Sequence, residues 1–87
     1  MAKKIGVIGG GSWGTALAKL LAENQNDVEI WCYEDWLATT INEERENTEY
    51  LPGFELPDNL SATNDLQEVI YEKDMLVSVM PSHVVRQ

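Results

Sequence analysis

The sequence has few basic residues, one cysteine and no long apolar run. Six lysines and arginines stand against fifteen aspartates and glutamates, for a formal net charge of −9, which argues against a nucleic-acid or anionic-membrane surface. Cys32 has no partner for an internal disulfide, so we interpret it as a small buried hydrophobe in a reducing compartment. No apolar run approaches the ~20 residues of a membrane span, and the N-terminal one is too short and glycine-rich for a signal peptide. We therefore expect a cytoplasmic protein without nucleic-acid or membrane partners.

The 87 residues contain 44% apolar side chains, which suits one small globular domain. Within them, Gly9, Gly11 and Gly14 have the spacing G-x-G-x-x-G between an apolar strand and a helix. Gly9 would turn the chain sharply, Gly11 would let the backbone approach a pyrophosphate, and Gly14 would let the helix pack closely on the strand. Ser12 and Trp13 then begin a helix, whose N–H groups and dipole favour an anion. A glycine-rich turn without a ligand is the alternative, and the flanking strand and helix favour a dinucleotide site.

The apolar pattern predicts alternating strands and helices. We expect strands at 3–8, 28–33, 60–63 and 75–80, and helices at about 12–24, at about 35–47 and after Asn64, which could cap a helix with Gln67 reaching back. The strand at 75–80 is apolar on both faces apart from Ser78, as in a buried central strand. In the first helix one face carries the larger apolar side chains, namely Trp13, Ala16, Leu17, Leu20 and Leu21. The pattern indicates the α/β class with a Rossmann-type doubly wound parallel sheet, truncated, of strand order 3-2-1-4.

An acidic residue follows the second strand where a ribose-binding carboxylate is expected. Glu34 comes 20 residues after Gly14, and Asp35 beside it is the competitor; a plain surface carboxylate is the structural alternative. A carboxylate here would accept hydrogen bonds from ribose hydroxyls and repel a 2′-phosphate. Because Tyr33 supplies no positive charge to offset that repulsion, we expect NAD to be preferred over NADP.

Two further features leave alternatives open. Residues 48–59 lack a helix pattern, and this long loop is either functional or a connection pinned by Tyr50, Leu51 and Phe54. His83 follows the fourth strand on the same sheet edge as the glycine turn, and a solvated or capping role is favoured over a catalytic one.

Four motifs in order resemble NAD(P)-dependent glycerol-3-phosphate dehydrogenase. Residues 9–16, G-G-G-S-W-G-T-A, are similar to that family's G-x-G-S-[WYF]-G-T-A. Residues 42–53 resemble its N-x-x-x-E-N-x-x-Y-L-P-G, residues 56–60 its L-P-x-N-L, and residues 79–83 its strand ending V-P-S-[HQ]. Together they are far more specific than the glycine spacing alone.

The resemblance implies an enzyme that interconverts sn-glycerol 3-phosphate and dihydroxyacetone phosphate by hydride transfer, for phospholipid synthesis. It implies that Ser12 and Trp13 contact the cofactor and that Pro81, in the last motif, belongs to the same site. Tyr33 falls where many members have arginine or histidine at the adenosine end of the cofactor, so a phosphate-binding role is not expected there.

Members of that family are several times longer, and their catalytic lysine lies beyond the position of Gln87. We therefore expect residues 1–87 to be the N-terminal part of a dinucleotide-binding domain, with the catalytic C-terminal domain absent. Within these residues we assign no catalytic residue and no metal site, and we expect an inactive fragment of a homo-oligomeric enzyme. Another Rossmann dehydrogenase, such as a ketopantoate reductase or hydroxyacid dehydrogenase, and a stand-alone dinucleotide-sensing module are the alternatives.

Overall fold

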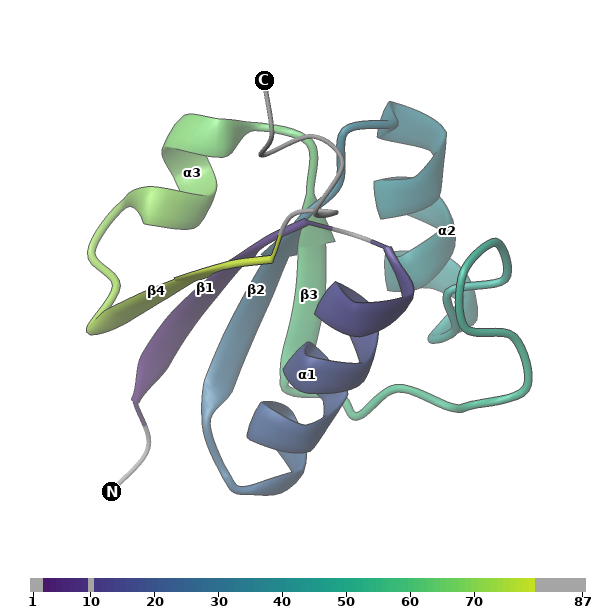
Figure 1. The fold of residues 1–87 in the computed structure, drawn as a ribbon, viewed down its shortest axis with the longest axis horizontal. Helices are drawn as coiled ribbons and strands as arrows, with labels where there is room; N and C mark the ends of the chain where they lie inside the picture. Colours follow the sequence, from purple (N-terminus) through teal and green to yellow (C-terminus); the bar gives the residue numbers. More distant parts are fainter. Residues whose placement is uncertain (1–2, 10, 80–87) are drawn as a thin grey trace.

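A computed structural model describes residues 3–9 and 11–79, which form one parallel sheet with helices on both faces (Figure 1). The strands lie in the order β3-β2-β1-β4, all parallel to their neighbours. The predicted class and strand order are therefore confirmed. The elements are β1 (Lys4–Ile8), α1 (Ser12–Glu23), β2 (Asp27–Trp31), α2 (Asp35–Glu44), β3 (Leu60–Thr63), α3 (Leu66–Ile70) and β4 (Met75–Ser78).

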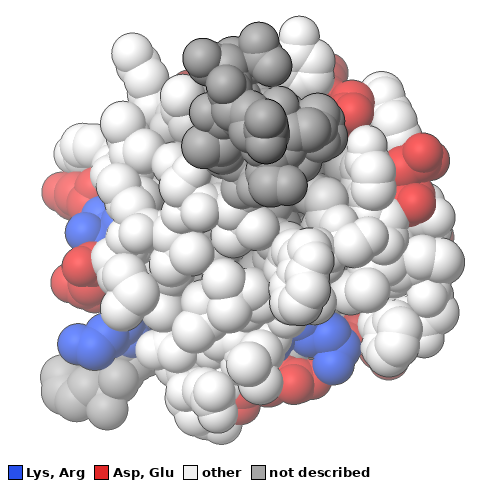
Figure 2. All heavy atoms as spheres, viewed as in Figure 1, with Lys and Arg blue, Asp and Glu red and all other residues white. Residues whose placement is uncertain are grey.

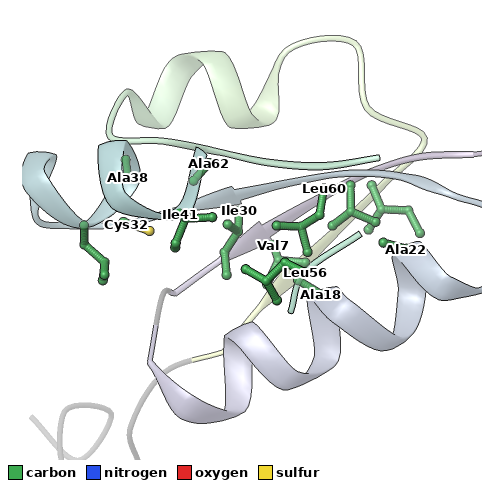
Figure 3. Close-up of a cluster of buried hydrophobic side chains, with 13 residues drawn as sticks. Val7, Ala18, Ala22, Ile30, Cys32, Ala38, Ile41, Leu56, Leu60 and Ala62 are labelled. Carbon is green, nitrogen blue, oxygen red and sulfur yellow. The ribbon is translucent and has the colours of Figure 1, made fainter. Parts of the chain in front are cut away.

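The hydrophobic core lies between the sheet and the two longer helices. In Figure 3 the side chains of Val7, Ile30 and Leu60 point from the strands toward α1, and Ile41 approaches from α2. Alternation along a strand sends neighbouring residues to the opposite face, so Gly6 faces α3. A side chain at Gly6 would overlap the carbonyl oxygen of Val69, so this glycine lets α3 lie directly on β1.

None of the helices in the described part of the chain is long and apolar enough to cross a membrane.

Helix α1 packs on the sheet through its small residues rather than through its large apolar ones. Its buried residues are Gly14, Thr15, Ala18 and Ala22, whereas Trp13 and Leu20 of the apolar face defined by spacing are exposed. Small side chains allow the close helix–strand approach that a turn this short imposes. Trp13 and Leu20 are thereby left exposed, beside the cavity and the loop described below, whereas Leu21 is partly buried against the core.

Strand β4 is an edge strand, and the prediction that it is buried on both faces is wrong. Met75 and Leu76 are 45% and 48% exposed, and Ser78 is exposed too. Only β1 pairs with β4 among the residues described, so its other edge keeps unpaired backbone groups there. An apolar run on both faces indicates a central strand, but burial requires neighbours that the described residues do not supply.

Three predicted details of the elements also differ. The predicted strand 28–33 ends in the structure at Trp31, and the predicted helix 35–47 ends at Glu44, because Arg45 takes a left-handed backbone conformation with φ of 57°. Helix α3 is capped by Asp65 rather than Asn64. The Asp65 carboxylate accepts hydrogen bonds from the N–H groups of Gln67 and Glu68, whereas the Asn64 amide donates to the Tyr33 carbonyl oxygen at 3.2 Å.

The face of the sheet under α3 holds a mostly buried ion pair. The Lys73 ammonium lies 3.0 Å from the Glu29 carboxylate and also donates to the carbonyl oxygens of Glu68 and Tyr71. Burial raises the pKa of Glu29, and the nearby Glu68 carboxylate raises it further, against the lowering effect of Lys73. Lys73 therefore stabilises a carboxylate that is costly to keep charged in this position.

Candidate functional site

A cavity of about 480 Å³ lies at the carboxyl edge of the sheet, where the glycine turn meets the ends of β2 and β4. This is the edge at which open parallel sheets bind ligands. The residues lining the cavity are Gly9, Gly11, Ser12, Trp13, Gly14, Trp31, Tyr33, Glu34, Tyr50 and Val79. Seven of the eight residues predicted to bind a cofactor are thus brought together, and the eighth, Pro81, lies outside the described residues, as does His83.

The three glycines of the turn occupy three different environments. Gly9 has φ of 127°, which residues with side chains rarely adopt, and a side chain there would overlap the Val79 carbonyl oxygen at the end of β4. A side chain at Gly14 would overlap the carbonyl oxygen of Gly9. Gly11 differs, because among the described residues other than its chain neighbours no atom lies within 4 Å of the position its Cβ would take. Gly9 and Gly14 are therefore required by the fold, whereas Gly11 borders open space in the cavity.

The N-terminus of α1 opens at the same cavity, and its own first turn carries no acidic residue. Gly11 is the N-cap residue, and no described side chain caps the helix. The N–H groups at the start of a helix, together with the helix dipole, favour an anion at this position. The glycine turn thus offers backbone donors and room for a phosphate.

Glu34 is the charged residue of the cavity lining and the N-cap residue of α2. Its charge is the largest cause of the raised pKa of Tyr50, and it adds to the burial that raises the pKa of Cys32 to about 12. Cys32 itself is fully buried, which confirms its interpretation as a small hydrophobe. Asp35, the alternative candidate, is exposed in the first turn of α2 and is not part of the cavity lining.

Aromatic side chains form much of the cavity wall. Trp13 and Tyr33 are 82% and 78% exposed, which leaves their rings available to a ligand. Trp31 contacts Tyr33 edge to face, with ring centroids 6.2 Å apart. Its indole N–H donates to the carbonyl oxygen of Asn64 at 3.0 Å, so the wall is tied to the end of β3. Such rings can bury the flat, apolar parts of a nucleotide.

The loop between α2 and β3 is both a packed connection and part of the cavity wall. Its anchors are Leu56, which is buried, and the Arg45 guanidinium, which donates to the carbonyl oxygens of Pro57 and Leu60. Phe54, predicted as an anchor, is exposed. Tyr50 instead lines the cavity, and its carbonyl oxygen accepts a 2.7 Å hydrogen bond from the Ser12 hydroxyl. The two alternatives for this loop are therefore not exclusive.

Trp31, Tyr50 and Val79 line the cavity but were absent from the residues assigned to the site. Trp31 precedes Tyr33 by two positions, and alternation along the strand is a signal that it faces the same side. The unusual length of the loop was the signal for Tyr50. In the described ranges 3–9 and 11–79, no three histidine, cysteine, aspartate or glutamate side chains gather as metal ligands would.

Charge on the surface supports the importance of backbone donors. In Figure 2 the described part of the face in view is uncharged toward its centre, and acidic and basic side chains both lie at its rim. Since the chain carries a formal net charge of −9, long-range attraction of an anionic ligand is not available. Binding of a dinucleotide here must rest on the N–H groups at the start of α1.

Comparison with known proteins gives consistent matches. Residues 4–87 match the family model described as the N-terminus of NAD-dependent glycerol-3-phosphate dehydrogenase. A glycerol-3-phosphate dehydrogenase [NAD(P)+] from Geobacter metallireducens is 52% identical over 99% of the chain, which covers 26% of that relative. The crystal structure of glycerol-3-phosphate dehydrogenase from Coxiella burnetii matches with a TM-score of 0.86 and 36% identity, over 93% of this chain and 25% of that one. The corresponding structure from Saccharomyces cerevisiae has a TM-score of 0.87 and 35% identity, over 99% of this chain and 28% of that one.

The chain thus spans about a quarter of the length of the relatives it matches. The agreement extends over almost all of the chain in sequence and in structure. It includes the glycine turn, the helix that follows it and the parallel strands that form the cavity edge. The chain belongs to the family of the N-terminal part of NAD-dependent glycerol-3-phosphate dehydrogenase.

Proposed function

We propose that this chain is the N-terminal part of a dinucleotide-binding domain and that its cavity binds NAD or NADP. The observation that supports this most is the uncapped N-terminus of α1 opening beside Gly11, with unoccupied space where a Cβ would stand. A pyrophosphate needs both features, namely close approach to the backbone and N–H donors. The residues present therefore fit the group that the family implies.

The remaining lining residues supply the other contacts in this proposal. Gly9, Gly11 and Gly14 shape the turn, while Ser12 and Trp13 lie where the pyrophosphate meets the helix. The Glu34 carboxylate accepts hydrogen bonds from the ribose hydroxyls. Tyr33 covers the adenosine end, and Pro81, which lies outside the described residues, is the eighth residue that we expect to contact the cofactor.

Glu34 also favours NAD over NADP. A 2′-phosphate on the ribose would bring negative charge beside this carboxylate, and the cavity lining contains no basic residue in the part of the chain described. Like charges at contact distance in a partly buried site disfavour binding by about 1.4 kcal/mol or more, which is at least about tenfold in affinity.

In the protein that carries this chain, the bound cofactor would donate a hydride to dihydroxyacetone phosphate in its reduced form, or accept one from sn-glycerol 3-phosphate in its oxidised form. The names of the relatives support this reaction. We propose that the protein is a cytoplasmic homo-oligomer and that it provides glycerol phosphate for phospholipid synthesis. The role of residues 1–87 is to bind and orient the dinucleotide, and these residues alone are expected to be catalytically inactive.

Titration of the 15N-labelled chain with NAD⁺ and NADP⁺, followed by NMR, tests the proposal at millimolar as well as micromolar affinity. We expect shifts at the glycine turn and around Glu34, with tighter binding of NAD⁺. Glu34→Gln removes the negative charge and keeps the shape of the side chain, so the preference for NAD⁺ over NADP⁺ should fall at least about threefold. Asp35→Gln is the matched control, because Asp35 is exposed and is not a lining residue. Absence of any shift at the glycine turn contradicts the proposal, and an unchanged ratio in Glu34→Gln contradicts the role of Glu34.

A further inference from the structure

The loop segment 48–53 is joined to the beginning of α1 by two side-chain hydrogen bonds. The Asn47 amide nitrogen donates to the Thr15 hydroxyl oxygen at 2.7 Å, and both residues are fully buried. The Ser12 hydroxyl donates to the Tyr50 carbonyl oxygen at the same distance. These bonds connect residues more than thirty positions apart in the chain. The first turn of α1 and the loop therefore hold each other in place.

Asn47 also determines the shape of the turn that carries Tyr50. Its side-chain oxygen accepts hydrogen bonds from the N–H groups of Glu49 at 3.2 Å and Tyr50 at 3.0 Å. Its carbonyl oxygen accepts from the Leu51 N–H at 2.9 Å. An amide bonded through both its nitrogen and its oxygen has one orientation available. The Tyr50 backbone is thus held by the Ser12 hydroxyl and by the buried Asn47 side chain, which is not itself in the cavity lining.

Tyr50 lies close to the carboxylate proposed to bind the ribose. Tyr50 and Glu34 line the same cavity, although the loop and the end of β2 are separate elements. The charge of Glu34 is the largest cause of the raised pKa of the Tyr50 hydroxyl, as expected for two groups that are near one another. A shift of the loop would therefore change the surroundings of the Glu34 carboxylate.

We propose that Asn47 is a positioning residue for dinucleotide binding, which holds Tyr50 against the beginning of α1 and close to Glu34 in the cavity lining. The inference rests on the proposed function, because it assumes that the cavity binds a dinucleotide. The alternative is that the Asn47–Thr15 contact only stabilises the fold. A residue that acts only on stability does not change the affinity of molecules that are already folded.

The test replaces Thr15 by valine, which has nearly the same shape and no acceptor for the Asn47 amide. The matched control is Thr40→Val, which likewise removes a helical hydroxyl, one that donates to the Trp36 carbonyl oxygen away from the cavity. Thr15→Ser keeps the hydroxyl and serves as the conservative rescue. Dissociation constants for NAD⁺ and NADP⁺ are measured by NMR titration at a temperature where melting curves show each variant to be folded.

We expect Thr15→Val to weaken NAD⁺ binding at least about fivefold, because the variant loses roughly one hydrogen bond that holds the loop in its binding position. NADP⁺ affinity should fall less, so that the preference for NAD⁺ decreases, while Thr40→Val and Thr15→Ser remain within about twofold of the parent chain. Unchanged NAD⁺ affinity in folded Thr15→Val overturns the inference. Failure of the unsubstituted chain to bind NAD⁺ overturns the proposed function instead, which keeps the two outcomes distinct.

If Thr15→Val does not fold, the Tyr50→Ala variant tests the inference instead, because Tyr50 is the lining residue that Asn47 is proposed to position. Tyr50 is partly exposed, so its truncation leaves the core intact. Positioning of Tyr50 by Asn47 matters only if Tyr50 contributes to binding, so we expect at least about a fivefold loss of NAD⁺ affinity. Tyr71→Ala is the control, since Tyr71 is exposed and is not a lining residue. Equal NAD⁺ affinity in the two variants refutes the inference.

Discussion

Gly11→Val separates the requirements of the fold from those of cofactor binding. No described atom outside its chain neighbours lies within 4 Å of the Gly11 Cβ position, and the backbone there is extended, with φ of −76° and ψ of −169°. Residues with side chains adopt this conformation freely, so we expect a valine here to be compatible with the fold. The folded state loses only the preference for glycine over valine at an N-cap position, about 1 kcal/mol or less.

The same valine side chain projects into the space where a pyrophosphate would approach the backbone. Its methyl groups would displace the phosphate from the N–H groups at the start of α1. We expect NAD⁺ affinity to fall at least ~tenfold, or ~1.4 kcal/mol. Calorimetric or NMR titration gives the affinity, and urea unfolding gives the stability of the same sample.

Gly14→Ala is the informative contrast, although its side chain is smaller. Its Cβ would overlap the carbonyl oxygen of Gly9, which is backbone and cannot move aside as a side chain can. We expect a loss of stability of about 3 kcal/mol or more, with α1 displaced from the turn. Unchanged NAD⁺ affinity in a folded Gly11→Val variant, or wild-type stability of Gly14→Ala, would refute the assignment of these two glycines.

Three further outcomes are expected. At pH 8 a thiol reagent should modify Cys32 on the order of 10³-fold more slowly in the folded than in the unfolded chain, because burial raises the pKa of its thiol from 9.0 to about 12, and equal labelling rates would contradict this expectation. Since the folded state retains the thiol proton to higher pH than the unfolded state, the free energy of unfolding should fall above about pH 9 by up to ~1.4 kcal/mol per pH unit. Lys73→Met should lower the free energy of unfolding in urea by about 1–3 kcal/mol at pH 7 and by less at pH 4, where Glu29 is protonated. The control Lys19→Met removes a surface ion pair and should lower it by under about 0.5 kcal/mol. Sedimentation equilibrium at micromolar concentration should detect self-association through the edge of β4, reduced in Met75→Lys; a monomer at all concentrations would exclude this edge as an interface.

The sheet and its cavity edge were predictable from local patterns. The glycine spacing, the apolar strands and the position of Glu34 each depend on residues close together in the chain. In a parallel sheet the carboxyl ends of the strands share one edge, so order along the chain is enough to place the turn and Glu34 side by side. This is why residues as distant as Gly9 and Glu34 were correctly expected to share one edge.

The errors arose where a residue's environment depends on distant segments. The spacing of Trp13 and Leu20 marks an apolar helix face, but only the closeness of β1 decides that small residues face the sheet. The bonds of Asn47 to Thr15 depend on how a long loop returns to α1, which no local pattern specifies. The exposure of Met75 depends on which strands pair with β4.

The contact between Gly9 and the end of β4 has a mechanical consequence. A Cβ added at Gly9 would overlap the Val79 carbonyl oxygen, and the Val79 N–H donates to the carbonyl oxygen of Ile8 at 2.8 Å. The turn and the residue after β4 are therefore in close contact. A displacement of the sheet edge is therefore transmitted to the first residue of the turn. We thus expect pairing along the outer edge of β4 and phosphate binding at the turn to influence one another, so that a change in one alters the free energy of the other.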